Sequence, residues 1–169
     1  MKSHPGGEAH TLRLLELTGL HHGASVLDMG AGAGESLALL RKLGYRAEGI
    51  DLAPRSKLVE QRDFLRTGYP DGSFDAVLSQ CAFFVSGDQP AALQEAHRIL
   101  RTNGLLMISD VFFKEPQALL EDAGFQTICA EDMTPQWREY YLEALWRDEC
   151  SCTVPKGKCS YMLLIGRKE

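Results

Sequence analysis

The sequence predicts an α/β fold in which a mostly parallel sheet is covered by helices on both faces. Two observations carry this prediction. Short apolar runs alternate along the chain with segments whose leucines recur at helical spacing. A glycine-rich turn also stands between the first strand and the helix that follows it, as in nucleotide-binding βαβ units. The length of 169 residues predicts a single domain covering residues 1–169.

The first half of the chain is expected to hold two helices and four strands. Gly23 and Gly44 follow the two leucine-rich segments and are suited to end helices. The tripeptide Pro70-Asp71-Gly72 predicts a turn before the fourth strand. In chain order, the expected elements are a helix over 11–20, a strand over 25–29, a helix over 36–43, and strands over 47–52, 58–61 and 74–79.

The second half continues the alternation. Asp88 can cap a helix that starts at Gln89-Pro90 and buries residues up to Leu100, and Asn103-Gly104 is expected to end it. The elements expected after it are a strand over 105–109, a helix over 116–123, a strand over 125–130, a helix from 134 and a strand over 161–165. The helix from 134 carries one apolar stripe, formed by Trp137, Tyr140, Tyr141, Ala144 and Leu145.

Composition excludes several classes of protein. The formal net charge of −5 shows no basic excess, so nucleic acid is not an expected partner. No apolar run approaches the roughly 20 residues of a membrane helix, and residues 1–5 do not begin a signal peptide. Five cysteines in a chain long enough to build a core predict a reduced, cytoplasmic protein. The oligomeric state is not predicted.

The glycine-rich turn at 30–34 predicts a nucleotide-like ligand whose identity depends on the neighbouring acids. Glu35 occupies the last position of a dinucleotide fingerprint, where an acid would face a pyrophosphate. Asp28, two residues before the first glycine, suits a cationic group better than a phosphate. Asp51 ends the next strand and is placed to bind ribose hydroxyls. The pattern therefore favours a ligand with a cationic end and a ribose over NAD.

Six segments, in order and at similar spacing, resemble the motifs of class I S-adenosylmethionine-dependent methyltransferases, namely residues 26–34, 48–52, 61–64, 71–79, 100–106 and 123–125. The resemblance runs from about residue 8 to the end and is closest to the ubiquinone/menaquinone (UbiE-type) and arsenite subgroup. It implies a Rossmann-like seven-stranded sheet of order 3-2-1-4-5-7-6 with an antiparallel last strand. Only eleven residues separate Asp51 from Asp63, so the segment between the second and third strands is shortened.

The resemblance also implies roles for individual residues toward S-adenosylmethionine. Asp51 would bind the ribose, Leu52 would pack on the adenine, and Asp63 and Phe64 would contact the adenine edge. Gln80 would close over the cofactor near its methyl group. The methionine portion would be held by Asp28 and by the backbone of the glycine loop, at Gly30, Ala31, Gly32 and Gly34.

The methyl acceptor is expected to be a small molecule, because no extra domain or basic surface serves a macromolecule. Residues that could border its pocket are Cys81, Asp110, Trp137 and Tyr140. Each has a structural alternative. Cys81 could be a small core thiol, Asp110 could cap the next loop, and the rings of Trp137 and Tyr140 could pack on the sheet. Residues 4–7 could fold over the mouth of the site. A metal site is not expected, although Cys150, Cys152 and Cys159 could bind a soft metalloid.

The function expected from these features is transfer of a methyl group from S-adenosylmethionine to a small molecule by in-line displacement. The alternatives are a non-catalytic module that binds the nucleoside or a partner protein, and a thiol or arsenite-type methyltransferase. A tRNA or protein methyltransferase, or an NAD-dependent dehydrogenase, is less favoured. Binding of NADH would indicate the dehydrogenase, and a steep fall of affinity with salt would indicate the tRNA enzyme.

Overall fold

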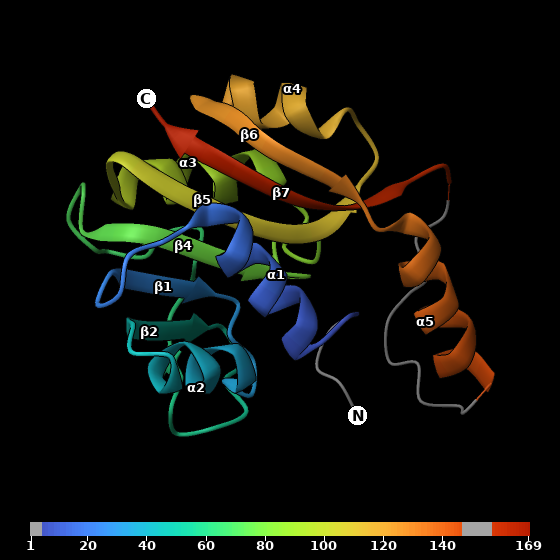
Figure 1. The fold of residues 1–169 in the computed structure, drawn as a ribbon, viewed down its shortest axis with the longest axis horizontal. Coiled ribbons are helices and arrows are strands. Elements are labelled where there is room, and N and C mark those ends of the chain that lie inside the picture. Colours follow the sequence, from blue (N-terminus) through green and yellow to red (C-terminus); the bar gives the residue numbers. More distant parts are fainter. Residues whose placement is uncertain (1–4, 147–156) are drawn as a thin grey trace.

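The computed structural model of the protein describes residues 5–146 and 157–169. Within them, the chain forms one sheet of seven strands (Figure 1). Strand β7 runs antiparallel to both of its neighbours, and the remaining pairs are parallel. The predicted order and the antiparallel last strand are both confirmed. In sheet order, the strands are β3 (Glu60–Gln61), β2 (Arg46–Asp51), β1 (Ser25–Met29), β4 (Phe74–Gln80), β5 (Leu100–Phe112), β7 (Ser160–Lys168) and β6 (Phe125–Asp132).

Helices cover both faces of the sheet, as the alternating pattern predicts (Figure 1). One face packs against α1 (Glu8–Thr18), α2 (Glu35–Lys42) and the first turn of α5 (Thr134–Trp146), through buried side chains such as Leu14, Leu37 and Trp137. The other face packs against α3 (Gln89–Ile99) and α4 (Pro116–Asp122). None of the described helices is long and apolar enough to cross a membrane.

Two predicted helix ends are wrong. The first helix runs from Glu8 to Thr18 and is capped by Gly19 in the left-handed conformation, rather than ending near Gly23. Helix α3 ends at Ile99, and Leu100 already belongs to β5, where it pairs with Phe74. Asn103 and Gly104 therefore interrupt the pairing of a strand and do not end a helix. The register between β4 and β5 shifts at this point, and Asn103 takes a positive φ of 62°.

The segment between β2 and β3 is shortened, as the sequence predicts. Residues 52–59 form turns and bends without a helix. The segment folds onto the glycine loop, because the N–H of Arg55 donates to the carbonyl of Gly32 at 2.9 Å. A Cβ atom at Gly34 would lie only 3.2 Å from the buried side chain of Val59. The short connection thus covers the loop directly.

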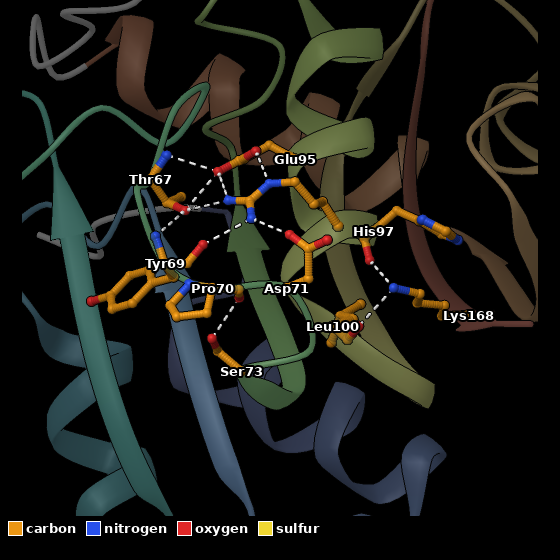
Figure 2. A network of polar contacts seen from close by, with 10 residues as sticks. Thr67, Tyr69, Pro70, Asp71, Ser73, Glu95, His97, Leu100 and Lys168 are labelled. Carbon is orange, nitrogen blue, oxygen red and sulfur yellow. Dashed lines mark hydrogen bonds and ion pairs between the residues drawn. The ribbon is translucent and has the colours of Figure 1, made fainter.

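A polar network ties the loop after β3 to α3 (Figure 2). The guanidinium of Arg98 donates to the carbonyl of Tyr69 at 2.8 Å, to Asp71 at 2.6 Å and to Glu95 at 2.7 Å. Glu95 also accepts from the N–H and the hydroxyl of Thr67 at 2.8 and 2.6 Å. Burial alone would raise the pKa of Glu95, but the hydrogen bonds from Arg98 and Thr67 outweigh it and hold the pKa at about 2. We call residues 67–71 with Glu95 and Arg98 the Arg98 network.

Lys168, near the end of β7, also binds α3, at the C-terminal end of the helix. Its ammonium donates to the carbonyls of His97 and Leu100 at 2.7 and 2.8 Å (Figure 2). These carbonyls lie at the C-terminal end of α3, where a cation is electrostatically favourable. Helix α3 is therefore bound at its C-terminal end by Lys168 of β7 and is tied, through the Arg98 network, to the loop after β3.

Candidate functional site

A cavity of about 370 Å³ lies at the carboxyl ends of β1, β2 and β4. Strands β2 and β4 flank β1 on opposite sides, so the chain reverses its order here, and ligands of open α/β sheets bind at such points. Most of the residues that the sequence singles out for the cofactor meet in this cavity. Its wall includes Gly30, Gly32, Asp51, Leu52, Asp63, Phe64 and Gln80.

The glycine loop is shaped by close backbone approach. Gly30 takes a φ of 89°, and a Cβ atom there would lie 2.2 Å from that of Ala82. The N–H groups of Gly30 and Ala31 both donate to the carbonyl of Ile50, at 2.9 and 3.0 Å. Ala31 and Gly34 do not line the cavity, so their part is to shape the loop. Only glycine fits at Gly30, because any side chain would displace the turn at Ala82.

The carboxylate of Asp51, at the end of β2, is oriented by two backbone N–H groups. One carboxylate oxygen accepts from the N–H of Gly32 at 2.9 Å, and the other accepts from the N–H of Ala53 at 2.9 Å. Each oxygen keeps capacity for a further hydrogen bond. Because Asp51 also lines the cavity, it offers two anchored acceptors to a ligand, which suits a pair of neighbouring hydroxyl groups.

Asp28 is a buried acid close to this site. Its side chain is 3% exposed, and among the described residues no donor forms a hydrogen bond with its carboxylate. Burial and the nearby charge of Asp51 raise the pKa of Asp28 to about 7. Asp28 does not line the cavity, but it lies two residues before Gly30, which does. A cationic ligand group nearby would stabilise its ionised form.

The side of the cavity nearest β3 is formed by Asp63 and Phe64. Asp63 accepts from the N–H of Leu65 at 2.8 Å, which orients its carboxylate. Phe64 is largely buried, and its ring centre lies 5.6 Å from that of Phe83. The exposed side chain of Leu52 completes this wall. The shortened segment before β3 therefore leaves all three predicted adenine-side residues on the cavity.

Of the four acceptor-pocket candidates, only Cys81 lines the cavity. Cys81 takes a φ of 56°, which is unusual for a residue with a side chain. Its N–H donates to the carbonyl of Ser109 at 2.8 Å, and its sulfur lies 3.3 Å from the hydroxyl of Tyr161. Cys81 thus joins the cavity wall to the end of β5 and to β7.

Asp110, Trp137 and Tyr140 lie outside the cavity wall. Asp110 is fully buried and accepts from the N–H groups of Phe84 and Val111 at 2.9 and 2.8 Å. Burial raises its pKa to about 7. It anchors the turn over 81–86, from which four residues do line the cavity: Cys81, Ala82, Val85 and Ser86.

The aromatic residues near the start of α5 pack on β7 or on one another instead. The ring of Trp137 stacks on Tyr161, with centres 6.0 Å apart, and meets Tyr141 edge-on at 4.9 Å. Tyr140 meets Tyr141 edge-on at 5.9 Å. In Figure 1, α5 stands beyond the edge of the sheet toward which β1 and β4 point. It is therefore on the same side as the cavity, although none of the α5 residues whose side chains are described lines it.

The cysteine cluster falls mainly outside the described residues, since Cys150 and Cys152 belong to the segment 147–156. Cys159 is a free, half-buried thiol. Across the described ranges, no three histidine, cysteine, aspartate or glutamate side chains gather as metal ligands.

Sequence reasoning missed six of the residues that line the cavity, among them Arg55, Val85 and Ser86. Arg55 lies in the shortened segment, where the sequence departs from the family pattern. Val85 and Ser86 lie in a turn that no periodicity marks. All three residues reach the cavity only because of how their loops fold, and no local sequence pattern indicates this.

The fold and the cavity define a class of nucleotide-binding α/β protein that binds its ligand at the point where the strand order reverses. Residues 27–108 match the family described as "Methyltransferase domain". This match covers just under half of the chain, and the sheet order is that of the class I methyltransferase fold.

Two curated relatives illustrate the similarity. Phosphoethanolamine N-methyltransferase 1 of Arabidopsis thaliana is 28% identical over 182 residues, covering 85% of this chain and 37% of the relative. Demethylmenaquinone methyltransferase of Tropheryma whipplei is 32% identical over 124 residues, covering 65% of this chain and 51% of the relative. The chain thus spans only about a third to a half of the length of these curated relatives.

Solved structures show the same fold. The phosphoethanolamine N-methyltransferase 2 of Haemonchus contortus, in complex with S-adenosyl-L-methionine, superposes with a TM-score of 0.77 at 18% identity. The superposition covers 98% of this chain and 53% of that one.

Proposed function

We propose that this protein binds S-adenosylmethionine in the cavity and transfers its methyl group to a small-molecule acceptor, releasing S-adenosylhomocysteine. The observation that carries the proposal is the pair of acids at the strand ends, the anchored Asp51 on the cavity wall and the buried Asp28 close to it. This pair suits a ligand with a ribose and a cationic end. The family match over residues 27–108 and a structural neighbour bound to S-adenosyl-L-methionine support the same cofactor.

The residues divide the binding work between the two ends of the ligand. Asp51 would accept the ribose hydroxyls, and Asp28 would face a cationic group of the methionine portion. The backbone of Gly30 and Gly32 allows close approach along the glycine loop. Asp63 would accept from the adenine amine, while Leu52 and Phe64 would cover the base. When bound, the cofactor supplies a methyl group activated by a positively charged sulfur.

The protein's task in the transfer itself is alignment. An in-line displacement needs the nucleophile of the acceptor opposite the departing sulfur, with water excluded. The turn over 81–86 borders the cavity, so Cys81 and Val85 would shape the acceptor pocket. Asp110 would act through this turn, and Trp137 and Tyr140 would approach only by a movement of α5.

The odd number of cysteines supports a reduced, cytoplasmic setting for the single domain.

The test is calorimetric titration of S-adenosylhomocysteine and of NADH into the wild type and Asp51→Ala. We expect the homocysteine nucleoside to bind the wild type and to bind the variant at least about tenfold more weakly, or about 1.4 kcal/mol. Asp122→Ala, which removes an exposed acid far from the cavity, is the matched control and should bind like the wild type. Binding of NADH alone, or no binding of either ligand, would contradict the proposal.

Turnover decides between an enzyme and a binding module of the same fold. Radiolabelled S-adenosylmethionine would be incubated with the protein and a panel of small acceptors carrying amine, thiol, hydroxyl or carboxyl nucleophiles. Appearance of label in any acceptor establishes methyl transfer. A protein that binds the cofactor tightly but labels none of them would favour the non-catalytic alternative.

A further inference from the structure

Gln80, the last residue of β4, has its side-chain amide held in one orientation. Its carbonyl oxygen accepts from the hydroxyl of Thr11 at 3.0 Å and from that of Ser36 at 2.9 Å. Thr11 lies on α1 and is fully buried, and Ser36 lies in the first turn of α2. Three segments far apart in the sequence therefore meet at one amide group.

The other end of the same amide is left without a partner. The Nε2 atom of Gln80 is buried, and among the described residues it forms no hydrogen bond. The side chain is 8% exposed and lines the cavity. Buried donors are almost always satisfied in folded proteins, so an unsatisfied donor in a residue that lines a cavity indicates an acceptor supplied by a ligand.

The position of Asp28 indicates which ligand group that is. Asp28 pairs in register with Leu78 across β1 and β4, and Gln80 follows two residues later. Asp28 and Gln80 therefore point to the same face of the sheet, with Cα atoms about 8 Å apart from strand spacing and rise. A buried carboxyl group and a donor without a partner among the described residues, at that separation, complement an ammonium and a carboxylate carried on one carbon.

We propose that Nε2 of Gln80 donates to the α-carboxylate of the cofactor's methionine portion, opposite Asp28, and that Thr11 and Ser36 are positioning residues for this amide. The inference rests on the proposed function, because it assumes that a cofactor with an amino-acid head group occupies the cavity. It adds α1 to the binding site through Thr11, a residue that does not line the cavity.

A neutral donor suits this place better than a cation. An arginine or lysine beside Asp28 and Asp51 would form ion pairs with them and cancel the negative charge that attracts the cationic end of the ligand. An amide donates without carrying charge, so the carboxylate gains a partner while both acids stay available. Its geometry must then be set by other groups, which is the task of the two hydroxyls.

The experiment compares two ligands by calorimetry on the full chain. S-adenosylhomocysteine carries the amino-acid head group, and 5′-methylthioadenosine has the same nucleoside and sulfur without it. In Gln80→Leu, we expect affinity for S-adenosylhomocysteine to fall about ten- to a hundredfold, while affinity for 5′-methylthioadenosine is unchanged. Gln80→Glu should weaken S-adenosylhomocysteine further, because it sets one carboxylate against another.

The positioning role is tested with Thr11→Val and Thr11→Ser. Loss of the hydroxyl in Thr11→Val frees the amide to rotate, so we expect a smaller loss, of several fold, again confined to S-adenosylhomocysteine. Thr11→Ser keeps the hydroxyl and should retain the wild-type preference. Ser79→Ala is the matched control, because this neighbouring buried hydroxyl has no hydrogen-bond partner among the described residues.

The outcomes separate the two proposals. Equal losses for both ligands in Gln80→Leu would indicate a structural role and overturn this inference, as would an unchanged preference for S-adenosylhomocysteine. Retained binding of 5′-methylthioadenosine shows in the same experiment that the variant is folded. If the wild type binds neither ligand, the proposed function fails and this inference fails with it.

Discussion

The two sides of the cavity are held in place by different chemistry. On the side of Asp63 and Phe64, the loop after β3 is tied to α3 by the Arg98 network, whose ion pairs reach the surface. On the side of Cys81, the turn over 81–86 is anchored by the fully buried carboxylate of Asp110. The side of Asp63 and Phe64 therefore depends on ion pairs in which each charge has a partner. The side of Cys81 depends on a carboxyl group whose ionised form is disfavoured by burial.

This contrast gives the two sides opposite responses to pH. Glu95 has a pKa lowered to about 2, so its contribution to stability is present above its unfolded pKa and is lost as pH falls through the acid range. Asp110 has a pKa raised to about 7, so the folded state holds a proton that the unfolded state releases between about pH 4 and 7. Its contribution therefore makes the protein less stable as pH rises through that window.

The largest expected effect concerns the decline of stability with rising pH that Asp110 causes. We expect the free energy of unfolding of the wild type to fall by about 2–4 kcal/mol between pH 5 and pH 8 because of Asp110, and Asp110→Asn to lack this part of the decline. Urea unfolding at a series of pH values measures both proteins. Asp28, whose pKa is also raised to about 7, should leave a residual slope in the variant. Parallel profiles for the two proteins would refute this account of the turn.

A smaller effect is expected on the other side of the cavity. Arg98→Ala should lower the free energy of unfolding by about 1–2 kcal/mol, since the Tyr69 carbonyl, Asp71 and Glu95 lose their shared donor. Binding of S-adenosylhomocysteine should weaken as the loop carrying Asp63 loosens. Urea unfolding and calorimetry report the two effects.

Arg98→Lys and Arg138→Ala are the controls for this prediction. The Arg98→Lys substitution keeps the positive charge, but an ammonium cannot reach three acceptors at once, so this variant should recover only part of the loss. Arg138 is an exposed arginine on α5, and its removal should change neither quantity. If Arg98→Ala lowers stability without affecting affinity, the network supports the fold but not the cavity.

The smallest expected effect concerns the backbone at Cys81. Its φ of 56° strains any residue with a side chain, so Cys81→Gly should be more stable than Cys81→Ala by about 1 kcal/mol. Both variants lose the contact of the sulfur with Tyr161, so the difference isolates the backbone. The same comparison at Ala82, adjacent in the turn and without a positive φ, should favour alanine. Equal thermal stabilities of the two Cys81 variants would show that the turn relaxes.

What could be predicted from the sequence follows from how local each feature is. The glycine loop and Asp51 lie at the ends of neighbouring strands, so strand periodicity and a short motif place them together on the cavity. Asp63 and Phe64 are part of a similar short motif, and the shortened segment before them does not remove them from the wall. The strand order came from the resemblance to a family and agrees with the structure.

What could not be predicted depends on contacts between distant segments. The amide of Gln80 is oriented by Thr11 and Ser36, which carry no motif and which meet it only when α1 and α2 pack on the same face. Leu100 fits the apolar stripe of α3 as well as a strand, and its pairing with Phe74 decides the matter. For Asp110 the sequence leaves two roles open, an acceptor-pocket residue and a carboxylate capping the next loop, and the backbone groups that it binds favour the second.

The place of β7 in the sheet has a consequence for the order in which the chain can fold. Among the described strands, β6 pairs with β7 alone, and β7 lies between β5 and β6. During synthesis, β6 therefore has no strand to pair with until residues 160–168 have been made, whereas β1 to β5 can already assemble around the cavity. A chain stopped before residue 160 would expose the edges of both β5 and β6, and such unpaired edges promote aggregation.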